Sequence, residues 1–180
     1  MSCFLKGKRI YLRKLQETDV NDEYLRWMND YEVVKYTESR FFPHTFESLN
    51  KYLSSIDNYH NIAFAIIDTA ENKHIGNIKL GNINYIHGFA DIGIIIGNKD
   101  FWGKGIATEA IDLLVEYSFK RLNLRRLIAG AYMENSGSIK AFEKVGFKKA
   151  YIENEKYLFE GRYMDAVTLE LTNKDSIKGN

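Results

Sequence analysis

Residues 91–110 read DIGIIIGNKDFWGKGIATEA and join an apolar run, a turn with two glycines and the start of an amphipathic segment. Apolar residues recur at helical spacing over residues 106–121, which predicts a helix there. Gly103 and Gly105 have no Cβ, so the turn can adopt positive φ and a ligand can approach its backbone closely. The free N–H groups and the positive dipole end of the helix then favour an anion, and a phosphate or pyrophosphate is the expected ligand.

Two other interpretations of this turn stay open. The glycines can serve only to connect a strand tightly to a helix, and Lys104 can be a solvated side chain rather than a phosphate ligand. A cation near a helix N-terminus is unfavourable unless an anion is bound there, which favours the ligand interpretation. A Rossmann dinucleotide site is disfavoured, because its fingerprint needs a third glycine where this chain has Thr108.

The composition predicts a single domain over residues 1–180. Of the residues, 45% are hydrophobic and 14% are aromatic, which suffices for one sizeable core. The formal charge is +1, from 25 basic and 24 acidic residues. Such a balance gives no electrostatic footprint for a nucleic acid or an anionic membrane surface, and we expect neither as a partner.

The chain also lacks the marks of a secreted, membrane or metal protein. No signal-peptide h-region is visible, and no apolar run approaches the ~20 residues needed to cross a bilayer, so we expect a cytoplasmic protein. Cys3 is the single cysteine, which excludes an internal disulfide and disfavours a cysteine nucleophile. The histidines are scattered without ligand spacing, and no metal site is expected at His44, His60, His74 or His87.

The apolar pattern predicts a compact α+β domain. We expect strands at residues 9–12, 62–67, 74–84, 90–96, 126–132, 147–154 and 165–171. We expect helices at residues 19–28, 45–55 and 106–121 and a shorter one within 135–146, with the following caps: Thr18, Thr45, Asn135 or Ser136, and Gly146 as the left-handed stop. Strand, helix and strand over residues 90–132 form a parallel crossover, and the last two strands form an antiparallel pair.

The order of these motifs identifies a family. DIGIIIGNKDFWGKGIATEA, followed by NSGSIKAFEKVGF and then GRYMD, resembles the GCN5-related N-acetyltransferases (GNAT). The similarity is to the branch with the bacterial ribosomal-protein N-acetyltransferases and spermidine acetyltransferases, and it runs from RIYLRKL to TLEL. It implies a three-layer α/β/α fold whose central, twisted, mostly antiparallel sheet has a parallel crossover at the acetyl-CoA site. It also implies acetyl transfer from acetyl-CoA to a primary amine.

The resemblance carries the cofactor contacts onto specific residues. The pyrophosphate of coenzyme A is expected on the backbone N–H groups of Lys104, Gly105, Ile106, Ala107 and Thr108. The pantetheine arm is expected to pair with the strand end at Ile95, Ile96 and Gly97, and Asn135 matches an asparagine that touches the cofactor. Asp100 departs from the Arg or Gln that is common in the family, which weakens a side-chain contact but leaves the backbone contacts unchanged.

The catalytic residues are less well determined. Phe142 stands where many members carry a tyrosine that is proposed to protonate the departing thiolate, and we expect it to pack on Phe147 instead. Ser138 is our candidate for the proton donor, with capping or solvent exposure as the alternative. Asp91 resembles the position of the family's acidic base, and Glu109 and Glu134 are the alternatives. A strand N–H near Ile95 or Ile96 is expected to stabilise the oxyanion.

The acceptor is expected between the early helices and the late hairpin. The candidate substrate-binding residues are Trp27, Tyr36, Glu38, Phe41 and Tyr163. Each aromatic residue can instead belong to the core, and Glu38 can hold a cation. A protein α-amino group and an amino sugar are the preferred acceptors. A polyamine is an alternative, and it is not preferred because the sequence shows no dense acidic lining for it. A coenzyme A-binding sensor without turnover also stays open, as does a homodimer.

Overall fold

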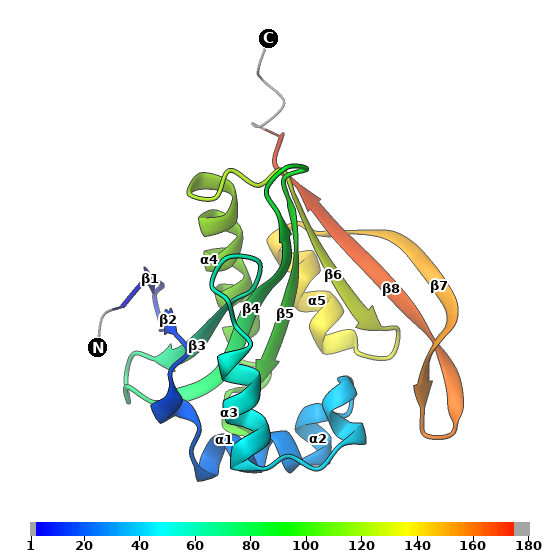
Figure 1. Ribbon diagram of the computed structural model, residues 1–180. Coiled ribbons are helices and arrows are strands. Elements are labelled where there is room, and N and C mark those ends of the chain that lie inside the picture. Colours follow the sequence, from blue (N-terminus) through cyan, green and yellow to red (C-terminus); the bar gives the residue numbers. More distant parts are fainter. Residues whose placement is uncertain (1–2, 175–180) are drawn as a thin grey trace.

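A computed structural model describes residues 3–174, whose core is one twisted sheet of eight strands in the order β1-β2-β3-β4-β5-β6-β8-β7 (Figure 1). All neighbouring strands are antiparallel except β5 and β6, which confirms the mixed α+β fold. The strands are β1 Leu5–Lys6, β2 Ile10–Lys14, β3 Ile62–Asp68, β4 His74–Asn84, β5 Phe89–Ile96, β6 Arg126–Tyr132, β7 Lys148–Phe159 and β8 Arg162–Thr172.

Helices cover both faces of this sheet and make the domain three-layered. The helices α4 and α5 bury the main core against one face, and α1, α2 and α3 pack on the other (Figure 1). The helices are α1 Asp22–Asn29, α2 Tyr31–Val34, α3 Phe46–Ser54, α4 Ile106–Lys120 and α5 Ser136–Val145, and the 3-10 turns are η1 Glu17–Asp19, η2 Glu38–Phe41 and η3 Lys99–Phe101. No helix within residues 3–174 has the length and apolar character that a membrane span requires.

The parallel pair β5 and β6 is short, and the two strands then separate. Their pairing covers only Phe89 to Asp91 on β5 and Arg126 to Ile128 on β6. Beyond this point β5 continues to Ile96 without a neighbour on that side, and Figure 1 shows the two ribbons diverging. The sheet therefore has a V-shaped opening in its middle, and backbone groups of β5 border it.

Several predicted caps are confirmed. Thr45 caps α3, Asn135 caps α5 by accepting a hydrogen bond from the Ser138 N–H, and Gly146 ends α5 with a φ of 106°. These caps succeed because a side-chain oxygen satisfies an unpaired N–H at the helix start, and a left-handed glycine turns the chain away at the end.

Two boundaries differ from the prediction. Asn21, not Thr18, caps the first helix, because its side chain accepts from the N–H groups of Glu23 and Tyr24. Asp19 precedes this helix and forms a buried ion pair with Arg13 at 2.6 Å. The late hairpin is longer than expected, since β7 and β8 run on to a turn at Glu160 and Gly161, where both φ angles are positive.

Candidate functional site

The turn before α4 presents an uncommon set of unpaired backbone donors. Gly103 and Gly105 have φ angles of 71° and 77°, and no atom lies within 4 Å of the place where a Gly103 side chain would stand. Among residues 3–174, no group accepts a hydrogen bond from the N–H groups of 103–108. Such donors at the N-terminus of a long helix fit a pyrophosphate, as the sequence predicted.

Arg9 holds the turn in this conformation. Its Nη1 donates to the carbonyl oxygen of Lys104 at 2.5 Å, and its Nη2 donates to that of Gly105 at 3.3 Å. With both carbonyls directed at the guanidinium, the turn's N–H groups are left for a ligand. The role of Arg9 was not predicted, since neither spacing nor composition links this residue to a turn so far along the chain.

Glu109 fixes Arg9 in turn. Its carboxylate accepts from the backbone N–H groups of Lys8 and Arg9 at 2.7 and 2.8 Å, and from Arg9 Nε at 2.9 Å. Partial burial raises the pKa of Glu109, but the hydrogen bonds from Arg9 and Lys8 outweigh it, and the pKa lies below its ordinary value. Glu109 is thus a structural anchor of α4 rather than a proton acceptor for substrate.

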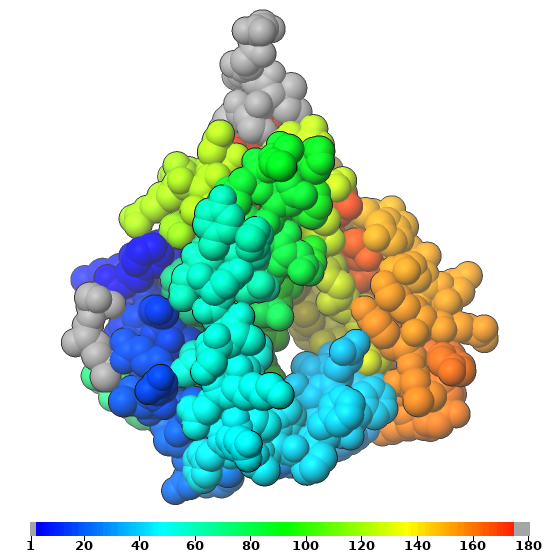
Figure 2. Space-filling view, in the orientation of Figure 1, coloured from blue at the N-terminus to red at the C-terminus, as the bar shows by residue number. Residues whose placement is uncertain are grey.

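A cavity of about 900 Å³ begins at the glycine turn and extends through the opening between β5 and β6. It reaches the helices on the opposite face of the sheet, and Figure 2 shows the surface hollowed between α3 and α2. A volume of this size accommodates an extended ligand together with a second small molecule. The predicted site residues that line it are Tyr36, Ile95, Ile96, Gly105, Ile106, Ala107, Thr108, Asn135 and Ser138.

The unpaired edge of β5 supplies further donors to the cavity. Gly97 donates its N–H to Ile75 of β4, so by alternation the backbone groups of Ile94 and Ile96 face the other way, toward β6. Trp102 Nε1 donates to the Ile96 carbonyl at 2.7 Å, which leaves the Ile96 N–H directed at the opening. The predicted oxyanion donor is therefore better placed at Ile94 or Ile96, because the Ile95 N–H is directed at β4.

Gly97 lies outside the lining and has a packing role. A Cβ there would come within 2.1 Å of Trp27 Cδ2, so the indole lies directly against the backbone where β5 ends. Trp27 itself is buried with Tyr24, Val33, Val34 and Leu49. The structure thus places Trp27 in the core beneath the site, as the alternative interpretation allowed, and not on the cavity surface.

At α5, the predicted residues Asn135 and Ser138 line the cavity, and Phe142 lines it while it packs in the core. Asn135 Oδ1 accepts from the Ser138 N–H at 3.2 Å, and both residues line the cavity. The Ser138 hydroxyl has no hydrogen-bond partner in the described part of the chain. Phe142 is 2% exposed and meets Phe147 edge-on, with 5.0 Å between ring centroids, which confirms the predicted contact.

The acidic residues proposed as bases do not line the cavity. Asp91 Oδ2 accepts from Asn82 Nδ2 at 2.7 Å, at the irregular end of the β4 and β5 pairing. Glu134 is exposed and pairs with Arg162 at 2.8 Å. This geometry does not support direct proton transfer from an amine in the cavity to either carboxylate, because each lies outside the lining and has a partner of its own.

Most of the aromatic residues proposed for the acceptor also lie elsewhere. Phe41 is half exposed under the Arg40 guanidinium, at 4.2 Å from its ring centroid, and Tyr163 is 65% exposed near the hairpin tip. Glu38 also lies outside the cavity lining, as does Lys104 among the residues predicted to bind the pyrophosphate. Tyr36 does line the cavity, where it stacks on Phe159 at 5.4 Å.

Other polar residues line the end of the cavity that lies beside α1, α2 and α3, which we call the acceptor end. Tyr24 and Tyr52 line it, and burial raises the pKa of both phenols, so both are donors at neutral pH. Glu32 lines it while paired with Lys35 at 3.1 Å. Lys79 lines it from β4 and was not predicted; its alternation with buried Ile78 and Leu80 is a signal for its face of the strand but not for the cavity. Within residues 3–174, no three of His, Cys, Asp and Glu are grouped to hold a metal ion.

Comparison with known proteins adds to this geometry. The chain matches the model of the acetyltransferase (GNAT) domain over residues 9–148. It is 30% identical over 180 residues to the probable N-acetyltransferase YjcK of Bacillus subtilis, covering 95% of this chain and 98% of that protein. It is also 30% identical over 163 residues to the spermidine N(1)-acetyltransferase of Vibrio cholerae, covering 88% and 90% of the two chains.

A solved structure is similar over nearly the whole length. The spermidine N-acetyltransferase of Vibrio cholerae, in complex with CoA and spermine, superposes with a TM-score of 0.83 at 26% identity. The match covers 96% of this chain and 100% of that one. The family and fold expected from the motifs are confirmed.

Proposed function

The chain belongs to the GNAT acetyltransferase family and uses acetyl-CoA as co-substrate, and we propose that it transfers the acetyl group directly to a primary amine held in the same cavity. The observation that carries this proposal is a set of free backbone donors at two places along the cavity, the β5 edge at Ile94 and Ile96 and the glycine turn at 103–108. Pyrophosphate binds the N–H groups of 103–108, the pantetheine arm runs along Ile94 and Ile96, and Asn135 contacts the cofactor from α5.

The bound thioester presents a carbonyl to the amine. In the proposed step the neutral amine forms a C–N bond to that carbonyl carbon, the C–S bond breaks, and the sulfur keeps the bonding electrons as a thiolate. The carbonyl oxygen gains negative charge as the amine attacks, and the N–H of Ile94 or Ile96 stabilises it by hydrogen bonding. The new amide loses one proton from nitrogen, and the thiolate gains one to become free coenzyme A.

The amine must be neutral before it attacks. An alkyl ammonium has a pKa near ~10.4, and partial burial in the cavity lowers it by disfavouring the charged form. Glu32 is the carboxylate in the lining, and its pairing with Lys35 leaves the proton to solvent. Ser138 is the proposed proton donor to the thiolate, because this residue lines the cavity and Phe142 has no proton to give.

The candidate acceptors are amines that differ in charge. Spermidine is suggested by the names of the Vibrio cholerae relatives, and a protein α-amino group or an amino sugar remains a candidate from the sequence. A sensor that binds coenzyme A without turnover is the remaining alternative, supported by Phe142.

A thiol-release assay with acetyl-CoA tests the proposal. We expect free thiol to appear only when an amine is added, with the acetylated amine identified by mass spectrometry. Coenzyme A binding by calorimetry, combined with no thiol release from polyamines, amino sugars, amino acids and peptides, would instead establish the sensor.

A further inference from the structure

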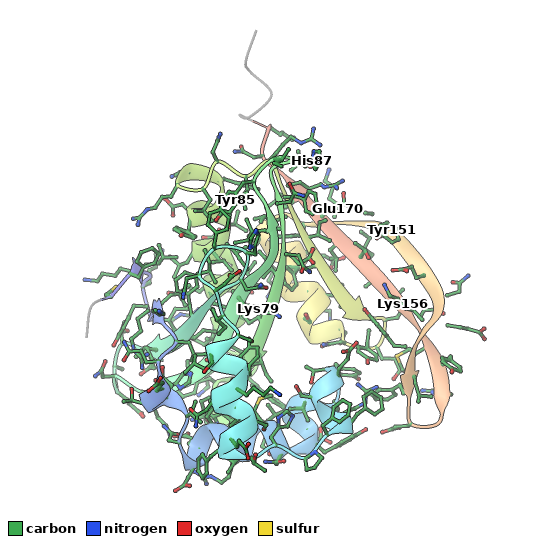
Figure 3. All side chains as sticks on the ribbon, in the orientation of Figure 1. Lys79, Tyr85, His87, Tyr151, Lys156 and Glu170 are labelled. Atoms are coloured by element: carbon green, nitrogen blue, oxygen red, sulfur yellow. The ribbon has the colours of Figure 1, made fainter. Side chains whose placement is uncertain are left out.

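Lys79 lines the cavity and lies across the glycines at positions 93 and 81, with its Nζ 4.0 Å from the place where a Gly81 Cβ would stand. It pairs with Gly93 on β5, and its Cγ and Cε lie 3.5 and 3.3 Å from the place where a Gly93 Cβ would stand. A side chain at position 93 would fill this space. The lysine therefore lies along the sheet surface that faces away from α4, beside the opening between β5 and β6 (Figure 3).

Lys79 is an exposed residue, and its ammonium has no protein partner among the described residues. Within residues 3–174 it makes no hydrogen bond and no ion pair, whereas Lys35 is paired with Glu32 and Lys99 with Asp30. Asp91 is the carboxylate that the register places nearest, opposite Gly81. Its Oδ2 is bonded to Asn82, and it forms no ion pair with Lys79.

The charged residues of the whole lining also favour an anionic ligand. Its one carboxylate is Glu32, which is already paired, while four lysines contribute to the lining. Lys140 and Lys144 belong to α5, on the cofactor side with Asn135 and Ser138. Lys79 is then the unpaired cation among the described residues at the acceptor end.

We propose that the acceptor amine carries an anionic group, a carboxylate or a phosphate, and that Lys79 binds that group. This inference rests on the proposed acetyl transfer and specifies its acceptor. A polyamine would place further ammonium groups beside Lys79 with no free carboxylate to offset them. An anionic amine pairs with Lys79, and the lysine charge also lowers the pKa of the adjacent ammonium toward the reactive neutral form.

Matched acceptors test this charge preference in the wild-type protein. Glucosamine 6-phosphate is compared with glucosamine, an amino acid with its carboxamide, and spermidine is tested alongside. A charge-assisted hydrogen bond predicts that kcat/KM is about tenfold to a hundredfold higher for the anionic member of at least one pair. A preference within the glucosamine pair indicates a phosphate, and a preference within the amino acid pair indicates a carboxylate.

Variants of Lys79 assign the preference to this residue. In Lys79→Met, KM for the anionic amine rises about tenfold or more, while KM for acetyl-CoA stays unchanged. Lys79→Glu brings spermidine above the anionic amine. Lys120→Met, an exposed α4 lysine paired with Glu116, is the control and changes neither constant. Calorimetry measures how tightly each protein binds the anionic amine in the presence of coenzyme A, without turnover. We expect these affinities to rank the variants in the same order as their KM values.

The outcomes separate this inference from the function on which it rests. The inference is overturned if wild-type protein prefers spermidine or the neutral member of both pairs, or if Lys79→Met leaves the anionic KM and calorimetric affinity unchanged. Thiol release from amines still supports acetyl transfer in those cases. No thiol release from any amine contradicts the proposed function itself.

Discussion

Trp27 lies directly against the backbone of Gly97, where β5 ends, so closely that a Cβ on the glycine would come within 2.1 Å of the indole. The contact joins the helices of the acceptor side to the strand that borders the cavity. It also shows why two residues predicted to touch ligands instead support the site from beneath.

The substitution Gly97→Ala therefore destabilises the protein. The methyl group overlaps Trp27 and forces the strand end or helix α1 to shift, at a cost of about 1–3 kcal/mol in the free energy of unfolding. Urea denaturation measures this loss. Gly137→Ala in α5 is the matched control, because the nearest atom to its new methyl is at 4.0 Å, and its stability should not fall.

Removing the guanidinium of Arg9 weakens cofactor binding. Arg9→Met leaves the Lys104 carbonyl without its donor and the Gly105 carbonyl with the Glu109 N–H alone, so the turn loses its fixed conformation and Kd for coenzyme A rises about tenfold. Calorimetry gives the Kd. Lys8→Met is the control, since Lys8 contacts Glu109 through its backbone. Equal Kd values for Arg9→Met and Lys8→Met would show that the turn keeps its shape without Arg9.

Ser138→Ala tests the proton donor. If the hydroxyl protonates the thiolate, kcat falls about tenfold while KM for acetyl-CoA is unchanged, because Asn135 still caps α5 through the backbone N–H of residue 138. Ser136→Ala on the exposed start of the same helix serves as the control. Unchanged turnover in Ser138→Ala would remove Ser138 from the mechanism.

His74 makes stability depend on pH. Burial lowers its pKa, and the charge of Asp19 raises it only partly back, so the folded protein favours neutral imidazole. Because the folded pKa lies below the ordinary ~6.5, this stability is complete above ~6.5 and is lost as the pH falls toward the lowered value.

Unfolding free energies at about pH 7.5 and about pH 5 measure this effect. The wild-type protein loses more stability between the two than His74→Gln does. A His74→Gln protein with the full wild-type dependence would place the titrating group elsewhere.

Local chemistry explains which features could be predicted from the sequence. The glycine turn, the Asn135 cap and the Gly146 stop each follow from a few adjacent residues and were all found. Arg9 and Lys79 act on residues far along the chain, so only the assembled sheet shows their roles. Asp91 matched a family position, yet the β4 and β5 irregularity gives it Asn82 as a partner, outside the cavity lining.

Two-substrate kinetics show whether the acetyl group passes directly from acetyl-CoA to the amine within one cavity. Thiol release is followed while acetyl-CoA and an accepted amine are varied together. We predict that both substrates are required and that the double-reciprocal lines intersect, because both occupy the cavity before the C–S bond breaks. Parallel lines, or thiol release at an unchanged rate without any amine, would contradict direct transfer.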